Sequence, residues 1–90
     1  MSTSKKHQNF VRESMKNKTI IEIAGIGQSA NDYFVRKGFT HAYHLLGQFL
    51  LMSCDKNVFD TWLQEEFPFI AEKQRNDIYY SLSEWCLNNL

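Results

Sequence analysis

The stretch IAGIGQ, at positions 23 to 28, holds the residues best suited to chemistry in this sequence. Its two glycines, Gly25 and Gly27, permit a tight turn, and Ile26 between them can anchor that turn in a core. Where such a turn leads into a helix, the first amides of the helix point outward and can donate hydrogen bonds to phosphate oxygens. The alternative is a plain turn between two helices, in which the glycines only satisfy backbone geometry.

A nucleotide-binding loop does not fit the same stretch. A dinucleotide fingerprint requires a third glycine where this chain has Ala30, and it requires a surrounding βαβ unit that the sequence does not predict. A Walker motif is absent as well. The ligand that remains for this turn is the phosphate backbone of a nucleic acid, which two amides can hold without reading any base.

The charge distribution is compatible with such a ligand. The net charge is zero, which by itself argues against a nucleic-acid-binding protein. Residues 1 to 18, however, carry five cations against Glu13, a balance of +4 that leaves −4 for the remaining 72 residues. The cations are Lys5, Lys6, Arg12, Lys16 and Lys18. A molecule charged in this two-ended way can bind a polyanion in one orientation, although a solvated terminus without a partner would have the same composition.

Catalytic and metal-binding patterns are poorly developed. His41 and His44 are three residues apart on one helical face, with Cys54 as a third candidate, but no further ligand completes a tetrahedral set. The carboxylates are spread as on solvated helix faces: Asp60, Glu65, Glu66, Asp77 and Glu84. We therefore expect no enzyme, no metal site and no cofactor.

Length and composition limit the elements that can position these residues. Ninety residues suffice for one domain, spanning residues 1–90, and a content of 43% hydrophobic and 14% aromatic residues suffices for one core. The N-terminus is polar, unlike a signal peptide, and no run of about 18 apolar residues could cross a membrane. Cys54 and Cys86 lack CxxC spacing, so we expect free thiols in a cytosolic or nuclear protein.

Helical signals run along nearly the whole chain. Ser4 is a suitable N-cap for a first helix near residues 5 to 13, and the helix after the glycine turn is expected to end at Gly38. The stretch HAYHLLGQFLLM, residues 41 to 52, is apolar almost all round, which is typical of a buried helix.

The second half of the chain predicts two more helices. Asp55 can cap the first of them, Pro68 ends it, and the last helix runs from about Ile70. Apolar residues recur at helical spacing in the first of these segments: Val58, Phe59, Trp62 and Leu63. No useful length of the chain alternates with period two. The predicted fold class is all-α, with five helices around a single core.

Several motifs in these helices match one known family. They are AGIG at 24 to 27, GF at 38 and 39, AY at 42 and 43, LGQFL at 46 to 50, FxxWL at 59 to 63, EWC at 84 to 86 and the opening MSTSKKH. Over its whole length the chain thereby resembles barrier-to-autointegration factor. The resemblance implies a compact homodimer with a helix-hairpin-helix motif at about residues 20–37, which holds double-stranded DNA without sequence preference. Because each protomer would hold one duplex, the dimer would bridge two.

The resemblance also implies partners, location and regulation. The partners would be DNA, a second copy of the chain or a paralogue, and LEM-domain proteins of the inner nuclear membrane. The protein would occur in the nucleus and cytoplasm, associated with chromatin and the nuclear envelope, without inserting into the membrane. Phosphorylation of Ser2, Thr3 and Ser4 would place negative charge beside Lys5 and Lys6 and so weaken DNA binding.

The expected DNA-binding surface combines three parts of the chain. By resemblance Lys6, Gly25 and Gly27 match contact positions of the family. The full set that we expect is Lys5, Lys6, Gly25, Ile26, Gly27, Ser29, Ala30, Ala71, Lys73 and Arg75. Asp32 and Tyr33 stand where the family usually has two lysines, and this difference is expected to weaken binding.

Gly47 lies in the middle of a helix of large residues, where a glycine costs up to about 1 kcal/mol. That cost makes sense if another backbone packs against Gly47, either across a dimer interface or at an ordinary helix crossing within the chain. The resemblance favours a dimer, with Leu46, Leu50 and Trp62 lining the contact. A groove for LEM-type partners is expected at the two-fold seam, near Phe39, Leu51 and Val58.

Two classes of function remain open. The first is a dimer that binds and bridges double-stranded DNA independently of sequence. The second is a dimerising protein adaptor that has kept the scaffold and the partner groove but lost most of its DNA affinity. Asp32 and Tyr33 are the residues that favour the second class.

Overall fold

A computed structural model describes residues 4–90 of the chain. It contains five α-helices and one turn of 3₁₀ helix in the order α1 (Lys5–Arg12), η1 (Ile20–Glu22), α2 (Gln28–Arg36), α3 (Ala42–Leu51), α4 (Lys56–Glu66) and α5 (Glu72–Asn89). Within these residues there is no strand, only a single antiparallel bridge between Thr19 and His41. The prediction of an all-α fold with five helices is confirmed.

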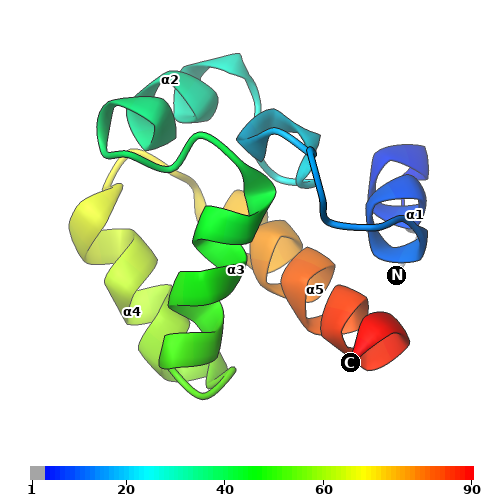
Figure 1. Cartoon of the computed structure of the whole chain (residues 1–90). Coiled ribbons are helices and arrows are strands. Elements are labelled where there is room, and N and C mark those ends of the chain that lie inside the picture. The colour runs from blue at the N-terminus through cyan, green and yellow to red at the C-terminus, as the bar shows by residue number, and fades with distance from the viewer. Residues whose placement is uncertain (1–3) are drawn as a thin grey trace.

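Helix α5 is the longest element, and it packs against the first helix, α1, as well as against α4. Helix α1 packs on one side of it and α4 on another, while α2 lies across the far end of the molecule from the α3–α4 turn (Figure 1). Every helix contributes to one core of buried side chains, among them Phe10, Ile26, Phe34, Phe49, Phe59 and Ile78. The prediction of a single core is confirmed, and α5 brings the N-terminal basic helix to the glycine turn.

Two helix starts follow the sequence signals. The Ser4 hydroxyl accepts a hydrogen bond of 3.1 Å from the His7 amide and caps α1. The Asp55 carboxylate accepts one of 2.9 Å from the Val58 amide and caps α4. Both caps satisfy amides that have no partner within the helix. Both predictions of a cap are confirmed.

The end of α2 is a Schellman motif built around Gly38. Gly38 has φ +91°, in the left-handed region that favours glycine. The Phe39 amide donates to the Phe34 carbonyl at 2.8 Å, and the Gly38 amide donates to the Val35 carbonyl at 3.0 Å. The rings of Phe34 and Phe39 then meet edge to face, 6.1 Å apart. This motif turns the chain from α2 toward α3.

Two sequence expectations about the helices were wrong. Helix α3 is not buried all round, because no helix within residues 4–90 covers one of its sides. Ala42 and Phe49 face the core, whereas Leu50 and Leu51 are 43% and 81% exposed. Helix α5 begins at Glu72 rather than near Ile70, which is buried in the turn after Pro68.

Candidate nucleic-acid interface

The glycine turn lies between η1 and α2, in the segment predicted to form the helical hairpin. Its first half is held from within, because the Ile26 amide donates to the Ile23 carbonyl at 3.1 Å and the Ile26 side chain is fully buried. The element before the glycine turn is η1, a single turn of 3₁₀ helix rather than a full α-helix. Ile26 thus anchors the glycine turn in the core, as the sequence predicted. The two glycines of this turn have different surroundings.

Gly25 is pressed against α5. Its φ is +100°, and a Cβ atom added there would lie 2.6 Å from the Gln74 carbonyl oxygen and 3.0 Å from the Asp77 Cβ. Neither contact could relax cheaply, because one partner is backbone and the other lies at the root of a helical side chain. At Gly25 the missing side chain thus allows the glycine turn to approach the backbone of α5, a contact within the protein itself.

Gly27 is open to solvent and caps α2. Its φ of −94° is ordinary, and a Cβ atom added there would meet no atom of residues 4–90 within 4 Å. The first hydrogen bond of the helix runs from the Asn31 amide to the Gly27 carbonyl at 2.9 Å. The amides of Gln28, Ser29 and Ala30 precede that bond, so they belong to the first turn, where amides have no intrahelical partner. The start of α2 thus presents amides at an uncovered surface, although the Ala30 side chain is buried.

Lys6 places a positive charge at the same turn. Its ammonium group donates a hydrogen bond of 2.8 Å to the Ile26 carbonyl, one residue before Gly27. Burial of part of the side chain lowers the pKa of Lys6 below its ordinary value of 10.5. A phosphate oxygen at the start of α2 would find both the amides and this ammonium within one small region. Lys5, the neighbouring cation, is exposed.

The position of Lys6 depends on its neighbour His7, which none of the sequence motifs singled out. His7 is buried between α1 and α5, where Nδ1 lies 3.3 Å from the Ser81 hydroxyl and Nε2 lies 2.9 Å from a Glu84 carboxylate oxygen. Its spacing from Phe10 and Val11 on the buried face of α1 was the available signal. The residue types match a Ser–His–Glu relay, but Ser81 is fully buried and donates to the Asp77 carbonyl at 2.8 Å. No substrate can reach that hydroxyl, so the cluster fastens α1 to α5.

The start of α5 supplies one further cation to this region. Lys73 is 86% exposed and its ammonium lies 3.0 Å from the Asp77 carboxylate, beside Gly25. Ala71 is the exposed N-cap residue of α5, but its amide already donates to the Gln74 side chain at 3.1 Å. The structure therefore brings Lys73 close to the glycine turn, with part of its charge balanced by Asp77.

Arg75 lies elsewhere and has an internal partner. Its Nε donates to the Asp60 carboxylate of α4 at 2.7 Å, and one of its terminal nitrogens donates to the Ile70 carbonyl at 3.0 Å. The side chain is mostly buried. Arg75 thus ties α5 to α4 and to the preceding turn, and the structure does not bring it together with Lys6 and Gly27. Sequence position alone could not distinguish it from Lys73.

The exposed side of α2 is nearly neutral. The Asp32 carboxylate accepts a hydrogen bond of 3.0 Å from the Gln28 amide group, within the first turns of the helix. The Tyr33 ring packs on Phe69 with 3.9 Å between centroids, and the Arg36 guanidinium lies 5.5 Å from the Tyr33 centroid. Tyr33 is therefore a packing residue that links α2 to the α4–α5 turn, and Asp32 is the anion that a bound phosphate would face.

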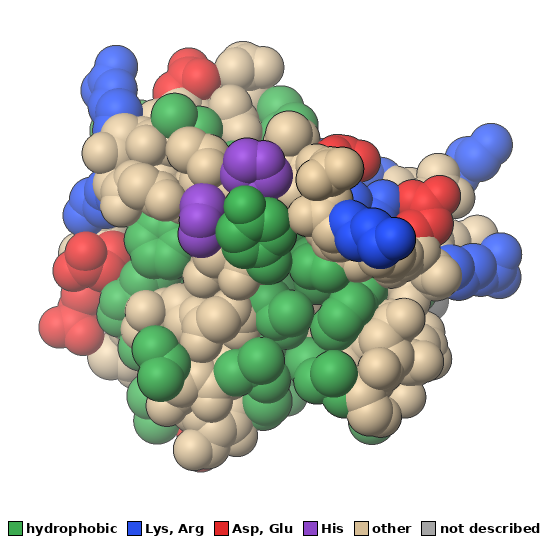
Figure 2. Space-filling view, viewed as in Figure 1, with side chains coloured by type: hydrophobic (Ala, Val, Ile, Leu, Met, Phe, Trp, Pro, Cys, Tyr) green, Lys and Arg blue, Asp and Glu red, His purple; other side chains and the backbone are tan. Residues whose placement is uncertain are grey.

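The four residues expected at a dimer interface have different surroundings in the protomer. Leu46 is buried, and Trp62 packs its ring against those of Phe39 and Phe59. Leu50 is half-exposed, and in the part of the chain that the structure describes no atom lies within 4 Å of a Cβ added at Gly47. Hydrophobic side chains gather over this side of α3 in Figure 2. An intramolecular helix crossing does not explain Gly47.

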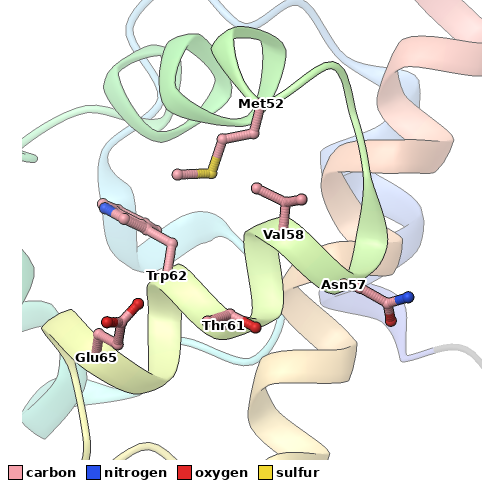
Figure 3. A pocket seen from close by; sticks show the side chains of 6 residues that line it. All are labelled: Met52, Asn57, Val58, Thr61, Trp62 and Glu65. Carbon is pink, nitrogen blue, oxygen red and sulfur yellow. The ribbon is translucent and has the colours of Figure 1, made fainter.

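An apolar groove lies between the end of α3 and the outer face of α4. Met52 and Trp62 approach each other across it, with Val58 on its floor (Figure 3). Its remaining lining is more polar: Asn57, Thr61 and Glu65. Of the residues expected at a partner groove, Val58 lines this one. Phe39 and Leu51 do not line it: the Phe39 ring packs against Trp62 with 5.7 Å between centroids, and Leu51 is exposed at the end of α3.

Other candidate sites have structural explanations. The His44 Nδ1 atom accepts hydrogen bonds of 3.2 Å from the Thr40 and His41 amides, so His44 caps the start of α3. Among residues 4–90 no group of three ligating side chains could hold a metal ion. Of the expected phosphorylation sites, Ser4 is the N-cap of α1. Ser2 and Thr3 lie outside the described residues.

The fold and the turn define a small all-α domain with a helical hairpin. A family model described as barrier to autointegration factor matches residues 1–89. The chain is 42% identical to barrier-to-autointegration factor of Drosophila melanogaster, over 93% of this chain and 92% of the relative. It is 44% identical to factor A of Xenopus laevis (94% and 93%) and 41% identical to the Homo sapiens protein (96% of each). The chain therefore belongs to the barrier-to-autointegration factor family, whose fold is a homodimeric helix-hairpin-helix fold.

A membrane-spanning helix was not found in the part of the chain that the structure describes: none of these helices is both long enough and apolar enough.

Proposed function

We propose that this protein binds the phosphate backbone of double-stranded DNA without sequence preference, and that a dimer of it bridges two duplexes. The observation that carries the proposal is the start of α2. There Gly27 leaves the helix amides uncovered, and the Lys6 ammonium lies at the adjacent Ile26 carbonyl. Backbone amides and one lysine can hold phosphate oxygens, and neither group reads a base.

The proposed contacts are few. The amides of Gln28 and Ser29 would bind one phosphate, and Lys6 would bind the same phosphate or its neighbour along the strand. Lys5 on α1 and Lys73 on α5 are further exposed cations, on the two helices that contribute Lys6 and the contact with Gly25. We leave Arg75 out of the site, because its guanidinium is held by Asp60 and Ile70. With two or three cations per site, electrostatic attraction is modest and salt-sensitive.

The exposed side of α3 is proposed as the dimer interface. A second copy of α3 packed on Gly47 would use the open space above this residue and would cover Leu50. The groove of Met52, Val58 and Trp62 is proposed to receive a LEM-domain partner, which would place the protein at chromatin and the nuclear envelope. The protein has no catalytic role in this proposal.

The adaptor function is the second candidate, and Asp32 favours it. This carboxylate lies within one turn of the proposed phosphate site and has no lysine as its partner; it accepts a hydrogen bond from Gln28 instead. Like charges repel over such distances, so Asp32 weakens phosphate binding. If that repulsion dominates, the chain would dimerise and bind protein partners without holding DNA.

A mobility-shift experiment on two variants of equal side-chain size but different charge separates the candidates. Gly27→Glu and Gly27→Gln place side chains of equal size at an open position, so both should fold. We expect wild type to shift two short blunt duplexes of unrelated sequence equally at low salt. Gly27→Glu should lose at least tenfold in affinity by repelling phosphate, roughly the effect of one close charge, whereas Gly27→Gln should lose much less. Equal behaviour of the two variants, or no shift by wild type, would contradict the proposal.

A further inference from the structure

The cluster of His7, Ser81 and Glu84 reaches the glycine turn as well as α1. The Ser81 hydroxyl donates to the Asp77 carbonyl at 2.8 Å, within α5, and also lies 3.5 Å from the carbonyl oxygen of Ala24, the first residue of the AGIG motif. His7 of α1 approaches the same hydroxyl with Nδ1 at 3.3 Å. One fully buried side chain of α5 thus lies between α1 and the turn.

The two segments that meet at Ser81 carry the proposed DNA contacts. Lys6 directly precedes His7 on α1, and its ammonium group reaches the Ile26 carbonyl in the turn at 2.8 Å. The turn itself is fixed on α5, because Gly25 lies in close contact with the backbone of that helix. The place of Lys6 beside the start of α2 therefore depends on how α1 is held against α5.

The hydrogen bonds around His7 fix the protonation state of its ring. Ser81 has a single hydroxyl hydrogen, which points to the Asp77 carbonyl at 2.8 Å, so its oxygen can only accept from His7 Nδ1. His7 Nε2 lies 2.9 Å from a Glu84 carboxylate oxygen, and an ionised carboxylate can only accept as well. Both ring nitrogens therefore donate, which requires an imidazolium ion. The 2.9 Å distance to Glu84 is typical of a charge-assisted hydrogen bond.

Glu84 is the counterion of this buried cation. The His7 side chain is 7% exposed and the Glu84 side chain 42%, so the carboxylate links a buried ring to the surface. A buried charge is costly unless a charged partner lies beside it. Asp77, two turns earlier on α5, pairs with Lys73 instead, at 3.0 Å. Glu84 can therefore be changed at the surface while the packing of α1 on the core stays intact.

We propose that His7, as an imidazolium, is a positioning residue for the DNA site. Its two N–H groups hold α1 against α5 through Ser81 and Glu84, and they thereby keep Lys6 at the start of α2. This inference rests on the proposed function, and it gives Glu84 an effect opposite to that of its charge. A carboxylate ordinarily repels DNA, so its removal strengthens binding. Here its removal weakens binding, because α1 and Lys6 lose a fixed position.

The first test measures the free protein by NMR and needs no DNA. Glu84→Gln keeps the length of the side chain and an acceptor oxygen but removes the charge. Near neutral pH, we expect both His7 ring nitrogens to be protonated in wild type and only one in Glu84→Gln. Because burial lowers the pKa of Lys6, loosening of α1 in the variant should return that pKa toward 10.5. A neutral His7 ring in wild type, or the same Lys6 titration in both proteins, would overturn the proposal.

The second test measures affinity for a short duplex by fluorescence anisotropy. Glu84→Gln should bind roughly fivefold more weakly than wild type, the effect of weakening one hydrogen bond. Glu72→Gln is the control, because it removes an equal charge from an exposed position of the same helix and should not weaken binding. In a Lys6→Ala background Glu84→Gln should lose its effect, because Lys6 is the residue that the cluster positions.

The outcomes separate this inference from the proposed function. An equal loss in both backgrounds, or tighter binding by Glu84→Gln in the wild-type background, would overturn the positioning role. Absence of DNA binding by wild type would contradict the proposed function alone, and the NMR result would then decide the role of His7.

Discussion

Gly25 and Gly27 have different structural roles, although they look equivalent in the AGIG motif. Gly25 combines a positive φ with contact to the α5 backbone, whereas Gly27 has an ordinary φ and open space. A substitution at Gly25 therefore tests the fold, and a substitution at Gly27 tests the surface. This division could not be read from the AGIG motif, because it depends on where α5 packs.

Gly25→Ala should destabilise the protein by about 2 to 5 kcal/mol, since it adds left-handed strain to a clash with the Gln74 carbonyl. The matched control is Gly27→Ala, which should cost less than about 1 kcal/mol because only the helix cap is weakened. Urea denaturation of the two variants measures the difference. Equal stabilities would show that the turn does not press on α5 as described.

Lys6 gives a prediction about pH. Because burial lowers its pKa below 10.5, Lys6 should lose its charge before an ordinary lysine as pH rises, and DNA affinity should fall over that interval. A bound phosphate stabilises the charged form, so duplex DNA should raise the pKa of Lys6. NMR titration of labelled lysine side chains, with and without a duplex, measures both effects. An unchanged Lys6 titration in the presence of saturating DNA would remove Lys6 from the site.

At the scale of elements, α2 is where DNA affinity is set. Asp32→Lys replaces an anion near the helix start with a cation and should tighten duplex binding roughly tenfold at low salt. Asp32→Asn, which keeps an acceptor for Gln28, should show a smaller gain. Tyr33 is unsuitable for the same test, because its ring packs on Phe69. Fluorescence anisotropy provides the affinities, and a gain for neither variant would show that DNA does not approach the start of α2.

The elements also show how far the sequence could be interpreted. Caps at Ser4 and Asp55 and the turn at Gly38 were predictable, because each depends on residues close together in the chain. The exposed side of α3 was not, since its apolar composition is equally typical of a helix covered by its own chain. The internal role of Arg75 was also out of reach, because its partner Asp60 lies on another helix.

At the scale of the whole molecule, a second copy should complete the surface of α3. Gly47→Glu adds a charge where the protomer has open space, so each protomer should still fold while self-association weakens about 100-fold or more. Val35→Lys is the control, because Val35 is as exposed as Leu50, at 43%, but lies on α2. Light scattering should show dimers for wild type and Val35→Lys and monomers for Gly47→Glu. A monomeric wild type at micromolar concentration would contradict the proposed interface.

The most direct test of the account is the affinity of the wild-type protein for two unrelated duplexes, measured across a range of salt concentrations. Phosphate contacts carry no base information, so the two affinities should agree within about twofold at every salt concentration. With two or three cations per site, the slope of log affinity against log salt should be roughly −2 to −3. No detectable binding at low salt, or a clear preference for one sequence, would contradict DNA-backbone binding at the glycine turn.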